Sequence, residues 1–225
     1  MQFDISNINM TYKKKKVLTD VSLSFGQGES IGILGENGTG KSTLLSILSG
    51  QFLPDSGSFM MDGTDLIKNE KLRQNVVAFV PQGTPLIEEL TARDNLRLWY
   101  SKDSMLASLD SGFLGMLGIN SFIDVPVHKM SGGMKKRLAI GCAIHANPKV
   151  LLLDEPTASL DILCKERIYT YFDYFKKSGG TILLVTHDER EISLMDRCFI
   201  LKNTKFYPYS YDGNMMQLAN NLRNE

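Results

Sequence analysis

The nine residues from Gly35 to Thr43 constrain this chain more than any other segment. They read Gly-Glu-Asn-Gly-Thr-Gly-Lys-Ser-Thr and fit the pattern G-x-x-x-x-G-K-[ST], which needs a strand before it and a helix after it. The apolar run Ile31 to Leu34 supplies the expected strand. Glycines let the backbone turn so that its N–H groups point inward at an anion. We therefore predict a β-strand, a phosphate-binding loop and an α-helix, in that order.

The pattern also predicts a role for each side chain of the loop. Lys41 is expected to place its charge on the β and γ oxygens of a triphosphate, and Ser42 to offer its hydroxyl to Mg²⁺. The residues expected to contact the nucleotide here are Gly35, Asn37, Gly38, Thr39, Gly40, Lys41, Ser42 and Thr43. An ordinary glycine-rich turn that caps a helix is the alternative, and the full nine-residue match disfavours it. The loop alone predicts a nucleoside triphosphatase.

Short apolar runs alternate with helical stretches, which is typical of a mostly parallel sheet covered by helices. The four predicted strands of this sheet are Ile31 to Leu34, Val76 to Val80, Val150 to Leu153 and Ile182 to Val185. Two further segments, Val21 to Phe25 and Ser58 to Met61, suggest a small antiparallel sheet. From about residue 84 to 127 leucines recur at helical intervals, which predicts a helical lobe. Polar residues follow the parallel strands, so we expect the active site at their carboxyl ends.

Two adjacent carboxylates, Asp154 and Glu155, directly follow the apolar run that ends at Leu153. Asp154 is expected to face Mg²⁺, directly or through a water, and Glu155 to orient and deprotonate the attacking water. An Asp-Glu pair taken alone is as readily a turn and a helix cap. The phosphate loop in the same chain favours the catalytic interpretation.

The segment from Met130 to Arg137 reads Met-Ser-Gly-Gly-Met-Lys-Lys-Arg. It resembles the signature segment of ABC ATPases, usually written LSGGQ and followed by basic residues. Other motifs of that family have counterparts in the same order along this chain. They are Tyr12, the phosphate loop, Gln82, the signature segment, Asp154-Glu155, Ser159-Leu160-Asp161 and His187. The resemblance therefore extends from about Tyr12 to His187.

The resemblance implies a P-loop NTPase (RecA-like) α/β fold with a mostly parallel core sheet, an antiparallel β-subdomain and an inserted helical subdomain. Residues 1–225 then form one ABC ATPase domain. Residues 1–82 and 141–225 are expected to make the nucleotide-binding core with its β-subdomain, and residues 83–140 the helical lobe that bears the signature.

The family's site roles carry over to matching positions. Tyr12 stands where an aromatic ring stacks on adenine, although simple packing near a strand end is the alternative. Gln82 matches a contact to Mg²⁺ and water, and His187 is expected to reach the γ-phosphate and the attacking water. Asp161 matches a loop that couples two active sites, with an exposed helix cap as the alternative.

Ser131, Gly132 and Gly133 are expected to begin a helix whose free N–H groups form a second anion site. The resemblance implies a head-to-tail pair in which this segment closes over the ATP held by the other subunit. The expected assembly is an ATP-dependent homodimer, or a heterodimer with a related ATPase. Met134 stands where the family most often has Gln, so we expect retained hydrolysis with weaker dimer closure.

Composition limits the partners. Lys+Arg and Asp+Glu both total 25, so no net charge draws the chain to nucleic acid, and no nucleic-acid partner is expected. The run Lys13 to Lys16 predicts a solvated turn, with a contact to ribose or phosphate as the alternative. Apolar runs of four residues are far shorter than the roughly 20 that span a bilayer.

Three scattered cysteines, Cys142, Cys164 and Cys198, are typical of a reducing compartment, and we expect all three to be buried. The first residues carry no basic segment followed by an apolar stretch, so no secretory signal is expected. We therefore expect a cytoplasmic protein that is peripheral on the inner face of the cell membrane.

Two function classes stay open. The favoured one is the energising ATPase subunit of an ABC transporter with a separate integral-membrane permease. The alternative is a soluble ABC ATPase of DNA maintenance, translation or cofactor assembly, which the lack of coiled coils, zinc modules or a second motor disfavours. A non-enzymatic scaffold is disfavoured because Lys41, Asp154, Glu155 and His187 are all present.

Transport direction rests on weaker features. The segment from Glu89 to Leu96 resembles the helical-lobe entry of exporter-type ATPases, and few residues follow the last apolar run, unlike importer ATPases with a C-terminal regulatory domain. Both features favour export. The substrate is not predicted, because cargo selection in this family lies mainly in the permease.

Overall fold

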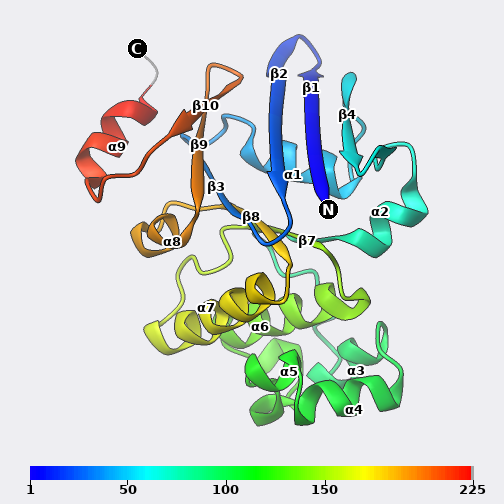
Figure 1. Cartoon of the computed structure of the whole chain (residues 1–225). Helices are drawn as coiled ribbons and strands as arrows, with labels where there is room; N and C mark the ends of the chain where they lie inside the picture. Colours follow the sequence, from blue (N-terminus) through cyan, green and yellow to red (C-terminus); the bar gives the residue numbers. More distant parts are fainter. Residues whose placement is uncertain (224–225) are drawn as a thin grey trace.

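The computed structural model describes residues 1–223 as two β-sheets stacked on a layer of helices (Figure 1). The larger sheet has six strands in the order β10-β9-β3-β8-β7-β6. Its strands are β3 (Ser30–Leu34), β6 (Val77–Val80), β7 (Val150–Asp154), β8 (Thr181–Val185), β9 (Arg197–Lys202) and β10 (Lys205–Tyr209). All neighbouring pairs are parallel except β10 with β9. The predicted mostly parallel α/β core is confirmed.

One of the four predicted core strands begins later than expected. Val76 is the last residue of α2 (Glu70–Val76), so the strand starts at Val77. The side chain of Asn69 caps this helix by accepting a hydrogen bond from the Leu72 N–H at 3.1 Å. This cap stabilises the start of α2, and the helix then continues to Val76. The sequence does not show that boundary, because buried helix ends and buried strands share the same apolar composition.

The second sheet is antiparallel and has the order β2-β1-β4-β5. Its strands are β1 (Gln2–Tyr12), β2 (Lys15–Gly26), β4 (Ser56–Met61) and β5 (Thr64–Asp65). The sequence did not predict β1, whose buried residues change from Phe3 and Ile5 to Ile8 and Met10. The change occurs at a register shift where Asn7 has φ 53°, and such an irregularity breaks strict alternation.

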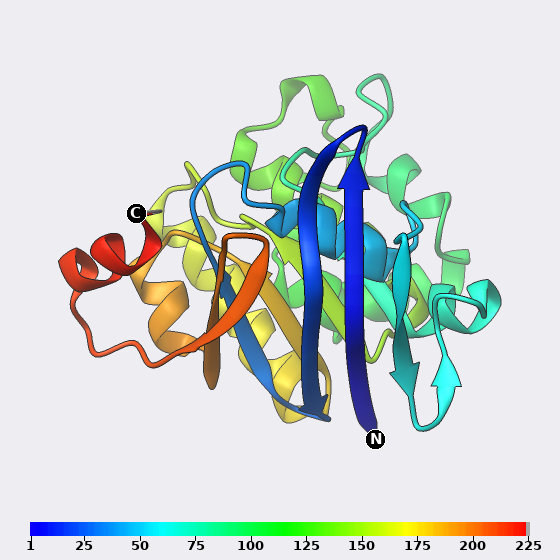
Figure 2. The same cartoon turned by 90° about the horizontal axis from the view of Figure 1, so that it is seen from above.

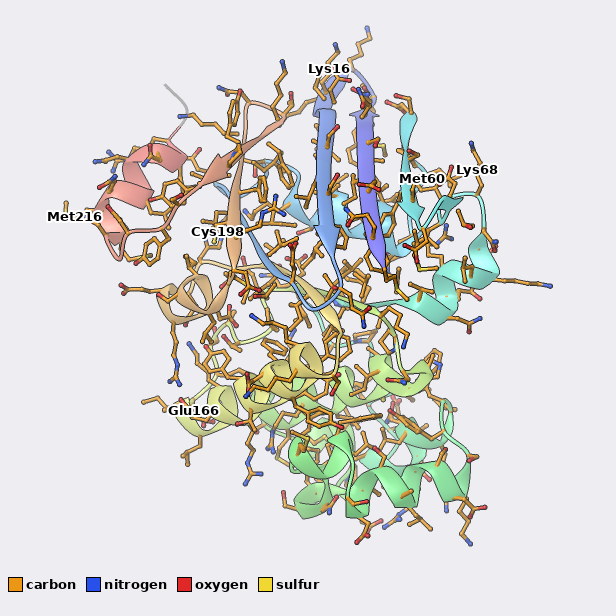
Figure 3. The ribbon with its side chains drawn as sticks, viewed as in Figure 1. Lys16, Met60, Lys68, Glu166, Cys198 and Met216 are labelled. Carbon is orange, nitrogen blue, oxygen red and sulfur yellow. The ribbon has the colours of Figure 1, made fainter. Side chains whose placement is uncertain are left out.

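The lysine run lies at the exposed end of the β1–β2 hairpin, where Lys13 and Lys14 form the turn and Lys15 and Lys16 begin β2. Lys13 to Lys16 are all exposed, and Lys16 lies at the end of this two-stranded ribbon (Figure 3). Seen from above, β1, β2 and β4 lie side by side over the helix that follows the phosphate loop (Figure 2).

That helix, α1 (Lys41–Ser49), packs between the two sheets. Leu44 and Leu45 are fully buried, in one cluster with Phe3 of β1 and with Val150 and Leu152 of β7. A fully buried leucine stabilises a fold by about 1.5–3 kcal/mol relative to an exposed one. These contacts hold the first turn of α1 against the carboxyl ends of the core strands.

The other face of the core sheet is covered by α6 (Gly132–Ala143) and α7 (Ile162–Lys177). Leu151 and Leu153 point to this side, opposite to Val150 and Leu152, because successive strand residues face opposite ways. Shorter helices lie beyond α6, farthest from the antiparallel sheet (Figure 1). They are α3 (Ala92–Arg97), α4 (Lys102–Asp110) and α5 (Phe113–Met116). The described residues also include 3₁₀ turns at Ile119–Phe122, Val127–Lys129 and Ile144–Ala146.

The C-terminal part contains elements that the sequence did not predict. They are α8 (Glu189–Leu194), β9, β10 and α9 (Met215–Leu222). Leu218 of α9 is buried against Leu34 and Ile200, so this part extends the core. Met216 lies on the exposed side of α9 (Figure 3). Among residues 1–223, no helix has both the length and the apolar character needed to cross a membrane.

The expectation for the cysteines is correct for two of three. Cys142 and Cys198 are buried, whereas Cys164 is only partly buried. Cys164 lies in the first turn of α7, and its N–H donates to the Asp161 carboxylate that caps that helix. A helix start at the surface leaves its first turn accessible on one side, which explains the wrong expectation.

Candidate active site

The phosphate-loop segment adopts a conformation that glycine permits and other residues resist. Gly38 and Gly40 have φ values of 81° and 109°, and a Cβ on Gly40 would lie 2.7 Å from Cγ1 of Val17. Gly40 also gives α1 no side-chain cap. The first N–H groups of a helix lack partners within it, so this end of α1 offers donors to an anion. The sequence prediction of strand, loop and helix is confirmed.

Lys41 is bent over the loop. Its side chain is 5% exposed, and Nζ donates to the carbonyl oxygens of Gly35 at 2.6 Å and Glu36 at 2.8 Å. Burial lowers the pKa of Lys41, while the carboxylates of Glu155 and Asp154 act in the opposite direction. An ammonium group held at the mouth of the loop can transfer its hydrogen bonds to phosphate oxygens.

A cleft of about 530 Å³ opens beside this loop. Its lining residues are Tyr12, Lys15, Val17, Asn37, Gly38, Gly40, Lys41, Ser42, Thr43, Gln82, Asp154, Glu155 and Val185. Ten predicted site residues are therefore brought to one cleft. Gly35 and Thr39 lie within the loop instead, where the Thr39 hydroxyl donates to the Glu36 carbonyl at 2.9 Å. Lys15 and Val17 also line the cleft. The sequence predicted a ligand contact only as an alternative for the whole run Lys13 to Lys16, and it predicted no role for Val17.

Tyr12 lies at the rim of the cleft, at the end of β1. Its side chain is partly exposed and contacts Phe52, with the ring centroids 6.1 Å apart and the planes at 84°. An exposed ring held by an edge contact keeps surface available for a flat ligand.

Asp154 and Glu155 lie at the carboxyl end of β7 and differ in environment. Asp154 is 5% exposed, and its pKa is raised by burial, while a hydrogen bond from the Ser42 side chain acts to lower it. Glu155 has φ 46°, in the left-handed region that costs energy for a residue with a Cβ. Its N–H donates to the Val185 carbonyl at 2.9 Å, which anchors this turn to β8.

Gln82 and His187 meet the Glu155 carboxylate from two sides. Nε2 of Gln82 donates to Oε2 of Glu155 at 3.0 Å, and Nε2 of His187 lies 3.6 Å from Oε1. Burial lowers the pKa of His187, the charge of Lys41 lowers it further, and the charge of Glu155 opposes both. The imidazole is therefore neutral near pH 7, as a group that accepts a proton or orients a water must be.

Three oxygen-bearing side chains of the cleft fit a magnesium ion. Ser42 and Asp154 already share a hydrogen bond, and the oxygen of the Gln82 amide is not the atom that contacts Glu155. Hydroxyl, carboxylate and amide oxygens are the hard donors that Mg²⁺ prefers. This donor set therefore fits the ion that the phosphate loop predicts.

The signature residues lie apart from this cleft. The hydroxyl of Ser131 accepts from the Met134 N–H at 3.3 Å and caps α6, and Ser131 and Gly132 are exposed. Gly133 is buried against α7, where a Cβ would lie 2.4 Å from Sγ of Cys164. Met134 packs against the apolar core beneath α6. None of these residues lines the cleft of its own chain as described by residues 1–223.

Two charged residues near the cleft, Lys136 and Glu191, are buried, which the sequence did not predict. Lys136 donates from Nζ to the carbonyls of Pro81 at 3.1 Å and Gln82 at 2.9 Å. Glu191 accepts from the hydroxyl of Thr157 at 2.8 Å and from that of Thr186. The sequence does not mark these burials, because the acceptors of Lys136 lie 54 and 55 positions away and Thr157 lies 34 positions from Glu191.

Comparisons with known proteins agree with this geometry. A family model described as ABC transporter matches residues 18–158. The Nod factor export ATP-binding protein I of Sinorhizobium fredii is 34% identical over 205 residues, which are 89% of this chain and 60% of that protein. The spermidine/putrescine import ATP-binding protein PotA of Spiroplasma citri is 33% identical, over 89% of this chain and 59% of that protein. The chain thus spans less than two thirds of these two relatives.

Other matches cover nearly the whole of both chains. The lantibiotic transport ATP-binding protein SrtF of Streptococcus pyogenes is 31% identical over 96% of this chain and 95% of that protein. A solved dimer of the ATP-binding cassette MJ0796 in a post-hydrolysis state with ADP and Pi superposes with a TM-score of 0.81 at 28% identity, over 92% of this chain and 98% of that one. Given the loop, the paired carboxylates and these matches, the chain belongs to the ABC transporter family and carries that family's ATPase cassette.

Proposed function

We propose that this chain binds ATP with Mg²⁺ and hydrolyses it to drive transport through a separate membrane permease. The observation that carries the proposal is the convergence on one cleft of Lys41, Ser42, Gln82, Asp154 and Glu155, at the uncapped end of α1. Phosphoryl transfer depends on positioning and charge stabilisation, and these residues supply both.

In the proposed complex, the triphosphate lies over the N–H groups of the loop and the first turn of α1. Lys41 exchanges the carbonyls of Gly35 and Glu36 for phosphate oxygens. Tyr12 at the rim takes the adenine, at the end of the cleft that Lys15 and Val17 also line. A stacked base adds about 1–3 kcal/mol of binding in comparable aromatic sites.

Ser42, Asp154 and Gln82 would hold the magnesium ion, which when bound supplies positive charge to the phosphate oxygens. Glu155 accepts the proton of the attacking water, and the Gln82 amide fixes the orientation of its carboxylate. Neutral His187, 3.6 Å from Glu155, donates or accepts a hydrogen bond at the same water or at the γ-phosphate.

We further propose that two chains pair head to tail. The start of α6 at Ser131 and Gly132 is exposed and lies outside the cleft of its own chain, so its N–H donors are available to a second nucleotide. Beside it, Ile162 and Leu163 of α7 are 74% and 77% exposed next to Asp161. Exposed aliphatic residues at a helix start suit a surface that a partner covers. Both a homodimer and a heterodimer with a related ATPase fit.

The permease is proposed to dock on the helical lobe, which we delimit as residues 83–140 within a single ABC ATPase domain. An apolar groove of about 360 Å³ lies between β6 and this lobe, lined by residues that include Phe79, Pro81, Leu86 and Trp99. Trp99 is 55% exposed, and Pro81 adjoins Gln82. A helix of the permease that enters the groove would therefore act one residue from the catalytic contact to Glu155.

Export is the favoured direction, and the proposed location is the inner face of the cell membrane, reached through the permease. The export proposal rests on the Glu89 to Leu96 segment, and relatives named for export and for import both match. Uptake or release of candidate substrates by cells that lack the chain decides the direction.

Calorimetry of Mg²⁺-ATP binding and phosphate-release assays test the proposed activity. Lys41→Ala should lose nucleotide affinity, and Glu155→Gln should bind ATP but turn over about 10²- to 10⁴-fold more slowly, as for loss of a general base. The exposed Glu70→Gln is the control and should match the wild type. Unchanged ATP binding in Lys41→Ala or full activity in Glu155→Gln contradicts the proposal.

A further inference from the structure

Lys136 is a buried lysine whose ammonium group reaches out of the signature helix to a different segment. Its side chain is 5% exposed, and it lies one and a half turns into α6. Nζ donates to the carbonyl oxygens of Pro81 and Gln82, the two residues that follow β6. The ammonium thus connects the helix that begins at Ser131 to the backbone of Gln82.

Packing alone does not account for a lysine at this position. Removing an ammonium group from water is costly, and an aliphatic side chain of similar length fills space without that cost. Burial lowers the pKa of Lys136, and the carboxylates of Asp154 and Glu155 act in the opposite direction. The charge is therefore tolerated because it faces the catalytic carboxylates and has two carbonyl acceptors.

Gln82 is held at both ends. Lys136 binds its carbonyl oxygen, and its own side-chain amide donates to Oε2 of Glu155. Any displacement of α6 relative to β6 must therefore change the backbone position from which the Gln82 side chain reaches Glu155. The carbonyl that Lys136 binds and the amide that contacts Glu155 both belong to Gln82. A shift of Lys136 therefore moves the residue that holds the Glu155 carboxylate.

We propose that Lys136 is a positioning residue, which fixes Gln82 against Glu155 and links the position of the signature helix to the orientation of the catalytic carboxylate. This inference rests on the proposed ATPase function. It assigns to Lys136 an effect on turnover rather than on nucleotide binding, since Lys136 does not line the cleft.

The neighbouring lysine provides a matched control. Lys135 lies on the same helix and carries the same charge, but Nζ binds the carboxylate of Glu88 at 2.8 Å and makes no contact with Pro81 or Gln82. Lys136→Met and Lys135→Met therefore remove the same charge from the same helix and differ in the contact to Gln82.

Phosphate release measures kcat and KM, and calorimetry in a Glu155→Gln background measures the dissociation constant for Mg²⁺-ATP. Lys136→Met should lower kcat about tenfold or more while ATP affinity changes less than about threefold. Lys136→Arg, which keeps donors at this site, should recover most of kcat, and Lys135→Met should stay within about threefold of the wild type. An unchanged kcat in Lys136→Met, or an equal loss in both methionine variants, overturns the proposal.

Hydrogen exchange gives a readout that does not depend on hydrolysis. The peptide spanning residues 79–86 should exchange faster in Lys136→Met than in the wild type or Lys135→Met, because the two carbonyls lose their donor. If the wild type proves inactive, the proposed function fails, while this measurement still tests the hold of Lys136 on Gln82. Equal exchange in all three proteins overturns the inference. Lys136→Leu, which also lacks a donor, replaces the methionine variant if the latter does not fold.

Discussion

Nε2 of Gln82 lies 3.0 Å from Oε2 of Glu155, although 73 positions separate the two residues in the chain. β6 and β7 are adjacent and parallel, with Val80 paired to Leu153, so the residues just beyond each strand meet at one edge. The contact thus follows from sheet topology. It places an amide donor on the carboxylate that the proposed mechanism uses as its base.

Removing this amide should slow turnover more than it weakens binding. Gln82→Ala is expected to lower kcat about tenfold at saturating Mg²⁺, because Glu155 loses the partner that orients it, with ATP affinity within about threefold. Steady-state phosphate release and calorimetry measure the two quantities. Gln74→Ala, on the surface of α2, is the control. A loss of ATP affinity equal to the loss in kcat would assign Gln82 to binding instead.

The pKa of His187 should lie below its ordinary value of about 6.5 and respond to two neighbours in opposite directions. Lys41→Met removes a charge that lowers this pKa, so the pKa should rise, whereas Glu155→Gln removes a charge that raises it, so the pKa should fall further. Because the folded pKa is depressed, the contribution of His187 to stability is lost as the pH falls below the unfolded value near 6.5. NMR titration measures the pKa of His187 in the wild type, in Lys41→Met and in Glu155→Gln. The His187→Gln variant identifies which imidazole resonance belongs to His187. If the pKa of His187 shifted in the same direction in both variants, the opposite effects of Lys41 and Glu155 on this pKa would be refuted.

Alanine substitutions at Gly40 and Gly63 distinguish the effect of backbone strain from the effect of a close contact. Gly40→Ala should unfold at a lower temperature and lose ATP affinity, because its Cβ would lie 2.7 Å from Cγ1 of Val17 and φ is 109°. Gly63→Ala is the matched control, with φ 87° and nothing within 4 Å of the added Cβ. It should cost about 1–2 kcal/mol of stability and leave ATP binding intact. Thermal unfolding and calorimetry test both variants, and equal ATP affinity in the two would contradict the role given to the loop.

The sequence predicted the strands whose apolar pattern matches their burial in the folded chain. β3, β7 and β8 are short apolar runs buried on both faces, and the loop before α1 is fixed by its glycines. β1 was missed because its alternation changes phase at Asn7. The start of β6 was misplaced because Val76 ends α2 and Val77 begins β6 without a break, and both are buried valines.

The sequence predicted those site residues that lie at the ends of parallel strands. It did not predict hydrogen bonds between segments that are far apart in the sequence. Glu155 and His187 lie just beyond β7 and β8, so their meeting follows from the parallel pairing of these strands. The hydrogen bonds of Lys136 join residues 54 and 55 positions apart, and those of Glu191 reach Thr157, 34 positions away. No local pattern marks such acceptors, since a buried charge has the same sequence signature as a solvated one until its partners are known.

Two subunits are proposed to share each ATP, and a structure of Glu155→Gln with Mg²⁺ and ATP is the most direct test of that sharing. We expect a two-fold dimer in which Lys41 contacts the γ-phosphate from one side and the partner subunit's Ser131 lies within hydrogen-bond distance on the other. ATP bound to Lys41 with Ser131 remote from every γ-phosphate would contradict it.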